Sequence, residues 1–220
     1  MGRGGIYYFK RATVTYYQAC LTLARKMVRV FALALDQPED AFDGMSIFLG
    51  ANGTINFYPP IRVSTENENG AEDSIGIGSH TDIQSFTLLY QDDVGGLNII
   101  NLDNEWIEAT PVPGTFIVNI GDFLMRTTND RWKSTVHRVN TNRSEKPRMS
   151  LPLFFGFNLS HRCAVLDSCI DSEHPAKYPP VSCGEVRENV SFHCSNSADG
   201  FQYVNMLMNK FFNKQTVESK

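Results

Sequence analysis

The sequence lacks the features that mark several large classes of protein. It has no run of basic residues, and its formal net charge is −4, from 20 Lys and Arg against 24 Asp and Glu. A nucleic-acid partner or an acidic membrane surface therefore has no electrostatic support. No stretch approaches eighteen uninterrupted apolar residues, so we expect no membrane-spanning helix. The N-terminus also lacks the apolar run of a signal peptide.

Cysteine is sparse, and its spacing indicates no disulfide framework or zinc knuckle. The five cysteines are odd in number and contain no Cys-x-x-Cys pair; they are Cys20, Cys163, Cys169, Cys183 and Cys194. We therefore expect free thiols in a reducing compartment, and we predict a cytoplasmic protein.

Size and composition favour one folded domain. The chain has 220 residues, of which 42% are hydrophobic and 20% charged, and this balance is typical of globular proteins. No internal repeat, low-complexity tract or long linker divides it. We therefore predict a single domain over residues 1–220, large enough to bury a substantial core.

An amphipathic helix is predicted near the start of the chain. Apolar residues recur there at alternating steps of three and four, ending near Pro38: Val14, Tyr17, Leu21, Ala24, Val28, Phe31 and Leu35. We expect this stripe to pack on the domain that follows, which is a commoner use of such a stripe than binding to a membrane surface. A second, closing helix is predicted over 201–211, after a coil that begins near 158.

Short alternating or β-branched segments separated by turn signals predict a mainly β domain. Asn52-Gly53 is read as a turn, 62–74 as a solvated loop and 121–122 as the start of a short helical piece. The spacing of the strands is typical of a β-sandwich or barrel with flanking helices. The predicted strands are 54–58, 75–80, 85–91, 97–102, 106–107, 115–120, 134–139 and 148–157.

Two histidines and one aspartate are candidate metal ligands. Side chains alternate faces along a strand, so His80 and Asp82 point the same way if the strand continues through them. His137 lies in another predicted strand, far enough along the chain to return beside the first. Two histidines and a carboxylate form the facial triad of non-haem Fe(II) oxygenases. A lone His-x-Asp is weak evidence, and the prediction depends on all three residues converging.

Arg148 and Ser150 are candidates for binding an organic carboxylate. They are two positions apart in a predicted strand, so both face one way. A guanidinium is a natural partner for a carboxylate, and the serine adds a hydroxyl donor. We expect a hairpin through 142–147 to join this strand to the one that carries His137.

Other candidates are more often structural. His161, His174 and His193 have no carboxylate in phase with them, and we expect none to bind metal. The apolar pocket candidates Phe86, Phe123, Trp132 and Phe154 are more often core residues than substrate contacts.

Several motifs, in this order, resemble the isopenicillin N synthase-like family of 2-oxoglutarate- and Fe(II)-dependent oxygenases. The resemblance extends over roughly residues 14–190. The matching segments are 56–60 (NFYPP), 78–82 (GSHTD), 91–97 (QDDVGGL), 113–116 (PGTF), 119–122 (NIGD), 133–139 (KSTVHRV), 148–152 (RMSLP) and 177–180 (KYPP).

This resemblance implies a double-stranded β-helix, or jelly-roll, core with both helices packed outside it. It implies that His80, Asp82 and His137 bind Fe(II), and that Arg148, Ser150 and Tyr58 bind 2-oxoglutarate. The implied reaction uses O2 and couples decarboxylation of 2-oxoglutarate to hydroxylation, desaturation or cyclisation of a small organic substrate in specialised metabolism. Family members usually carry a sizeable region before the long helix, and we expect that region to be largely absent here.

Two alternatives remain open at the level of sequence. The first is that the chain is a non-catalytic barrel relic that acts as a binding protein. The second is that it is an Fe(II) oxidase of the same fold that uses no 2-oxoglutarate. Succinate release separates the first alternative from the enzyme. Activity without added 2-oxoglutarate identifies the second.

Overall fold

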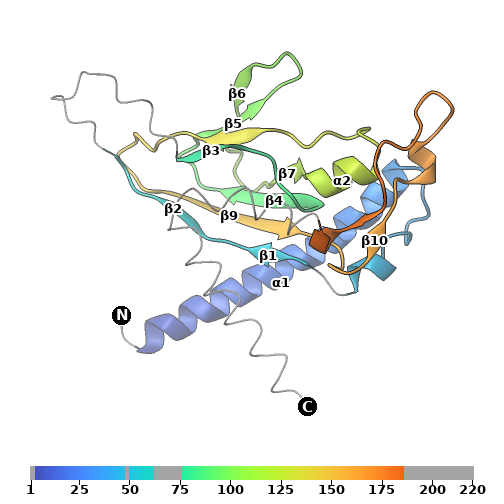
Figure 1. Ribbon diagram of the computed structural model, residues 1–220. Helices are drawn as coiled ribbons and strands as arrows, with labels where there is room; N and C mark the ends of the chain where they lie inside the picture. The colour runs from blue at the N-terminus through green and yellow to red at the C-terminus, as the bar shows by residue number, and fades with distance from the viewer. Residues whose placement is uncertain (1–2, 48–49, 62–75, 186–220) are drawn as a thin grey trace.

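The computed structural model describes residues 3–47, 50–61 and 76–185, and its main elements are one long helix and two larger β-sheets (Figure 1). The predicted solvated loop over 62–74 and the predicted closing helix over 201–211 lie outside the described residues, as do His193 and Cys194.

The N-terminal helix α1 spans Arg3–Ala34 and lies along one face of the larger sheet (Figure 1). Its end agrees with the prediction: Asp36 adopts a left-handed backbone conformation with φ of 58°, and Pro38 follows. The helix begins well before Val14, where the predicted stripe starts. Its first turns carry the exposed side chains Ile6 and Tyr7, so apolar periodicity did not reveal them.

Nine of the described strands form two antiparallel sheets, which is the jelly-roll arrangement expected, and β10 and β11 form a separate two-stranded sheet. Sheet A has the order β1-β9-β4-β7, with β2 also paired to β9, and sheet B has the order β3-β8-β5-β6. Sheet A contains β1 (Asn52–Gly53), β2 (Asn56–Tyr58), β4 (Phe86–Gln91), β7 (Ile117–Ile120) and β9 (Arg148–Phe155). Sheet B contains β3 (Ile77–His80), β5 (Leu97–Ile100), β6 (Trp106–Glu108) and β8 (His137–Val139).

Smaller elements join or follow the sheets. Helix α2 (Asp122–Thr127) follows β7 at the predicted position, and a short 3-10 turn, η1, spans Gly44–Ser46. The segment after 158 was predicted to be coil, but it contains a paired β10 (Arg162–Cys163) and β11 (Val181–Ser182) and a turn η2 (Asp167–Cys169). These pieces are two or three residues long, which is too short for a periodic pattern to show.

The main hydrophobic core lies between α1 and sheet A. The side chains of Ala24 and Val28 from the helix are almost fully buried against Leu88 and Phe155 of the sheet. Phe86 and Phe123 belong to this core and Trp132 packs against it, so three of the four aromatic pocket candidates are structural, as expected.

The opposite face of sheet A faces away from the helix and carries polar as well as apolar side chains. Residues that are directly paired on neighbouring strands share a face of the sheet. Thr87 of β4 pairs with Asn119 on β7, and Gln91 of β4 pairs with Ser150 on β9. Arg148 lies on this face as well, because it is two positions from Ser150. The strands thus bury apolar side chains towards α1, while the face inside the barrel mixes these polar residues with apolar ones such as Leu89 and Phe154.

Two local predictions were wrong. Asn52-Gly53 is the strand β1, paired with β9, and not a turn. No hairpin joins β8 to β9: β8 pairs with β3 and β5 in sheet B, while β9 pairs within sheet A. The connection crosses between the sheets and is held by Asn142, whose amide donates to the carbonyls of Tyr58 and Lys146.

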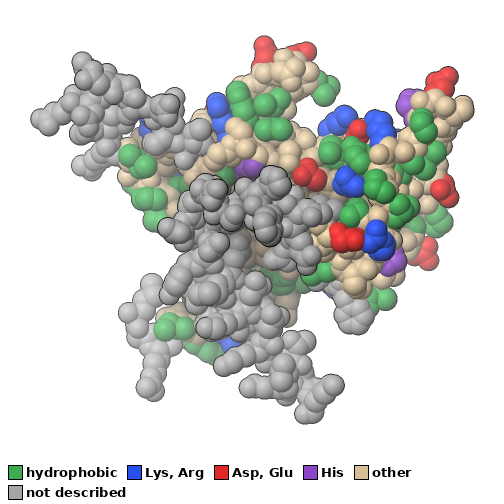
Figure 2. Space-filling model, viewed as in Figure 1, with side chains coloured by type: hydrophobic (Ala, Val, Ile, Leu, Met, Phe, Trp, Pro, Cys, Tyr) green, Lys and Arg blue, Asp and Glu red, His purple; other side chains and the backbone are tan. Residues whose placement is uncertain are grey.

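The surface and the cysteines agree with the compositional analysis. In the part of the chain that the structure describes, no helix is both long and apolar enough to cross a bilayer. The four described cysteines are free thiols. On the face shown in Figure 2, basic and acidic side chains are interspersed, without a broad patch of one sign.

Candidate metal centre

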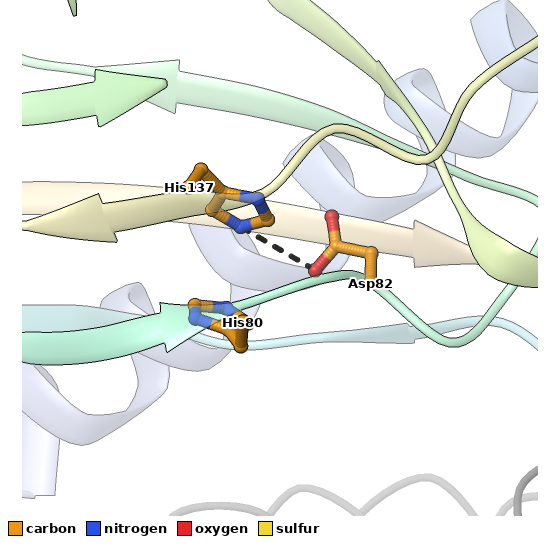
Figure 3. A group of neighbouring side chains, drawn as sticks. All are labelled: His80, Asp82 and His137. Carbon is orange, nitrogen blue, oxygen red and sulfur yellow. Dashed lines mark ion pairs between the residues drawn. The ribbon is translucent and has the colours of Figure 1, made fainter. Parts of the chain in front are cut away.

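The side chains of His80, Asp82 and His137 converge at one end of sheet B (Figure 3). One candidate ligand atom from each residue lies within 4.8 Å of the others. The Nε2 atom of His137 is 3.7 Å from Oδ1 of Asp82, and the two imidazole centroids are 4.3 Å apart. Among the described residues this is the one such cluster of histidine, cysteine and acidic side chains found.

Strand pairing brings the two histidines together. His80 ends β3 and His137 begins β8, and the two are directly paired in the antiparallel register, next to an irregularity in β3. Asp82 lies in the loop that follows β3 and not in a strand. The predicted convergence of His80 and Asp82 is therefore present, but strand alternation is not its cause.

Hydrogen bonds leave one nitrogen of each imidazole available. The Nδ1 atom of His80 is 2.7 Å from the carbonyl of Gly78, and Nδ1 of His137 is 3.0 Å from the carbonyl of Thr135. A carbonyl only accepts, so Nδ1 carries the proton in both rings and Nε2 keeps its lone pair. Desolvation lowers the pKa of His80 below its usual value, and the neighbouring His137 acts in the same direction. A neutral imidazole of this tautomer is the form that binds a metal.

Arg148 is a buried cation with only neutral partners. Its side chain is 1% exposed, and it donates to the carbonyl of Gly95, to Oε1 of Gln91 at 3.2 Å and to Oγ of Ser150 at 3.4 Å. No carboxylate of the described residues forms an ion pair with it. A buried charge is costly without a counter-charge, so this site suits an anionic ligand.

Tyr58 completes the surroundings of the guanidinium. It is paired with Arg148 across β2 and β9, and the guanidinium carbon lies 4.8 Å from the centre of its ring. The Tyr58 hydroxyl is buried and makes no well-formed hydrogen bond with the described residues, although Ser150, Arg148 and Asn56 lie near enough to act on its pKa. Burial raises the pKa of this phenol, while the charge of Arg148 acts to lower it. The hydroxyl is therefore protonated at neutral pH and free to donate to a ligand.

The inner strand faces carry further residues of the site that sequence reasoning missed. Thr87 and Asn119 contact Asp82, and Gln91 contacts Arg148. Each interrupts a mainly apolar strand on the face turned away from α1, and that polar alternation was a signal available in the sequence. Phe154 also lies on this face, paired with Thr87, unlike the other three aromatic candidates.

The remaining described histidines lie outside the cluster. His174 pairs with Asp171, and both side chains are largely exposed, while His161 is exposed at the surface.

A groove of about 510 Å³ beside α1 is lined by Arg25, Lys26 and Arg29, but Arg29 is already paired with Asp43. Neither the remaining described histidines nor this groove offers a second metal centre.

Two histidines and one carboxylate at the edge of a two-sheet antiparallel barrel define the class of mononuclear non-haem iron proteins. Residues 52–157 match the family model described as the 2OG-Fe(II) oxygenase superfamily. The chain belongs to this superfamily, and its motifs are consistent with the isopenicillin N synthase-like branch.

Relatives of similar sequence are also named as 2-oxoglutarate- and Fe(II)-dependent enzymes. The chain is 49% identical over 178 residues to the 2-oxoglutarate-Fe(II) type oxidoreductase ppzC of Metarhizium rileyi, covering 80% of this chain and 47% of the relative. It is 38% identical to the 2-oxoglutarate-Fe(II) type oxidoreductase hxnY of Emericella nidulans, covering 81% of this chain and 50% of that one. The chain thus spans about half the length of these relatives.

Solved structures show the same fold. The crystal structure of a full-length Neurospora crassa protein in complex with alpha-KG and thymine superposes with a TM-score of 0.75 at 28% identity, covering 84% of this chain and 57% of that one. A putative 2OG-Fe(II) oxygenase family protein from Caulobacter crescentus gives 0.76 at 29% identity, covering 88% and 62%. The fold prediction of a jelly-roll core with an outer N-terminal helix is confirmed.

Proposed function

We propose that residues 1–220 form one 2-oxoglutarate-dependent Fe(II) oxygenase domain, which couples decarboxylation of 2-oxoglutarate to oxidation of a small organic substrate. The observation that carries this proposal is the cluster of His80, Asp82 and His137, with ligand atoms within 4.8 Å of one another, on a barrel that also buries an unpaired guanidinium. Family membership supports the same reaction class.

The donor set fits Fe(II). Both imidazoles present Nε2, and Asp82 presents a carboxylate oxygen towards His137, so two nitrogens and one oxygen are offered from one side. Bound Fe(II) supplies the redox chemistry by which O2, 2-oxoglutarate and the substrate react. His80 and His137 would hold the metal from the ends of two paired strands, and Asp82 from the loop that follows β3.

Arg148, Ser150 and Tyr58 are the proposed binding group for the distal carboxylate of 2-oxoglutarate. The guanidinium supplies the counter-charge and a planar set of donors, while the two hydroxyls supply further donors. Gln91 and the Gly95 carbonyl hold the guanidinium in place before the ligand arrives. The charge that is costly to bury in the free protein is thereby offset in the complex.

The proposed substrate is a small organic molecule, and no nucleic-acid or membrane partner is proposed. The absence of a single-sign charge patch on the face in Figure 2 and the net charge of −4 support this choice. Free thiols at the four described cysteines support a reducing compartment such as the cytoplasm.

The test is to add Fe(II) and 2-oxoglutarate to the purified chain without O2 and record the visible spectrum. We expect a weak charge-transfer band in the wild-type protein and in the surface control His161→Ala, and none in His137→Ala. Folded wild-type protein that forms no band contradicts the proposal. Admitting O2 and measuring succinate then separates the enzyme from a binding relic, and turnover without 2-oxoglutarate identifies an oxidase that does not use it.

A further inference from the structure

The two oxygens of the Asp82 carboxylate have different surroundings. Oδ2 accepts a hydrogen bond from Oγ1 of Thr87 at 2.6 Å and another from Nδ2 of Asn119 at 2.8 Å. Oδ1 instead faces Nε2 of His137 at 3.7 Å. Asp82 is 5% exposed and Thr87 is 3% exposed, so water does not compete freely for these bonds.

The two donors come from rigid, neighbouring positions in sheet A. Thr87 on β4 and Asn119 on β7 are direct partners in the antiparallel register, and both point to the face turned away from α1. Because an ionised carboxylate only accepts hydrogen bonds, two donors on one oxygen occupy its lone pairs and orient the whole group. Donors on adjacent strands hold that orientation better than donors on a loop.

The backbone of the metal-ligand loop is held by the same part of the chain. The amide of Asp122 donates to the carbonyl of Asp82 at 2.7 Å, and the amide of Phe123 donates to the carbonyl of Ile83 at 3.2 Å. A Cβ at Gly121 would lie 2.0 Å from the carbonyl oxygen of Gln84, so only glycine permits this approach. Segment 119–122 therefore fixes both the backbone and the side chain of Asp82.

We propose that Thr87 and Asn119 are positioning residues that make Asp82 a ligand through Oδ1 alone. This inference rests on the proposed function, since it concerns the same metal centre. A carboxylate that binds through one oxygen takes one coordination position, whereas a chelating carboxylate takes two. Two imidazoles and one such oxygen occupy half of an octahedral shell and leave the other half to a chelating 2-oxo acid and O2.

The experiment measures metal affinity without turnover. Fe(II), or Co(II) as an air-stable substitute, is titrated calorimetrically into the full chain and its variants. Thr87→Val and Asn119→Leu remove one donor each at similar volume, and we expect each to weaken binding roughly 10- to 100-fold. Thr87→Ser keeps the hydroxyl and restores affinity to within a few-fold. Thr127→Val is the control, because that buried hydroxyl donates to Leu124 within α2 and not to Asp82.

The visible spectrum of bound Co(II) separates positioning from general stability. If Oδ2 becomes free to chelate, the intensity and pattern of the Co(II) bands change in Thr87→Val and Asn119→Leu but not in Thr127→Val. Unchanged affinity and unchanged bands in both variants, with the wild type binding normally, overturn the inference. A folded wild-type chain that binds neither metal instead removes the proposed function itself.

Discussion

His80 and His137 each engage Nδ1 with a backbone carbonyl two residues earlier in the chain, and Asp82 engages Oδ2 with two side chains. At the scale of single residues, the site is thus defined by the atoms that remain available. Nε2 of His137 lies 3.7 Å from Oδ1 of Asp82, and one candidate ligand atom of each of the three residues lies within 4.8 Å of the others. Residue types and spacing predict the three candidate ligands, but they contain no information on which atom is engaged elsewhere.

Arg148→Lys tests the guanidinium. Lysine keeps the charge but loses the planar set of donors, so we expect the Kd for 2-oxoglutarate to rise roughly 10- to 100-fold, which corresponds to about 1.5–3 kcal/mol. We expect the affinity for Fe(II) to stay within about two-fold of the wild-type value, because none of the three candidate metal ligands forms a hydrogen bond with Arg148. Titration of 2-oxoglutarate into the iron-loaded protein measures the change, and the exposed Arg25→Lys is the control. An equal loss of iron affinity argues against separate roles.

Tyr58→Phe tests a buried hydroxyl that makes no well-formed hydrogen bond with the described residues, although Arg148 and Ser150 lie beside it. An unpaired buried polar group is destabilising, so removing it should raise the free energy of unfolding of the metal-free protein by up to about 1 kcal/mol. The same change should weaken 2-oxoglutarate binding several-fold, since a donor is lost. Urea unfolding and ligand titration measure the two effects. A clear loss of stability in the metal-free protein shows instead that the hydroxyl has a structural role.

At the scale of elements, the position of Asp82 depends on the loop after β3 and not on the strand itself. The prediction that His80 and Asp82 face the same way assumed that the strand continues to Asp82, but β3 ends at His80, where the predicted strand 75–80 also ended. Contacts with segment 119–122 hold Asp82 in place, and these contacts join positions about forty residues apart, as with Asn119 and Asp82. Local periodicity contains no information on such a contact. The motif order still predicted the site, because both segments were recognised as parts of one pattern.

Gly121→Ala tests the close approach between this segment and the loop. The added Cβ would meet the carbonyl oxygens of Gln84 and Asp82 at 2.0 and 2.9 Å, so the loop must shift. We expect a loss of stability of roughly 1–3 kcal/mol, as for overpacking of a core, together with weaker metal binding. Gly44→Ala is the matched control, since a Cβ there also meets nothing within 4 Å and the residue lies in η1, outside the metal-ligand cluster. Unfolding and metal titration of both variants check the result, and equal behaviour of the two contradicts the account.

Helix α1 gives a second element-scale test. Val28 is 2% exposed against sheet A, while Val30 in the same helix is 54% exposed. We expect Val28→Ala to lower the free energy of unfolding by roughly 1.5–3 kcal/mol, and Val30→Ala to change it by less than about 0.5 kcal/mol. Denaturant unfolding of the metal-free protein measures both. Similar losses for the two variants are incompatible with the described packing of the helix.

At the scale of the whole molecule, the two proposed ligand sites come from different sheets. His137 begins β8 in sheet B and Arg148 begins β9 in sheet A, and the chain crosses between the sheets over the eleven positions that separate them. The alternation of turns and short strands predicted a sandwich or barrel. It did not predict which strands pair, because a hairpin and a crossover of the same length have the same local sequence features.

The most direct test of the metal centre is a crystal structure of the Fe(II)-loaded chain, with iron located by its anomalous scattering. We predict one iron peak at about 2.1 Å from Nε2 of His80, Nε2 of His137 and Oδ1 of Asp82, the usual bond length for such ligands on a divalent first-row metal. A peak elsewhere, or iron bound without His137, would contradict the proposed centre.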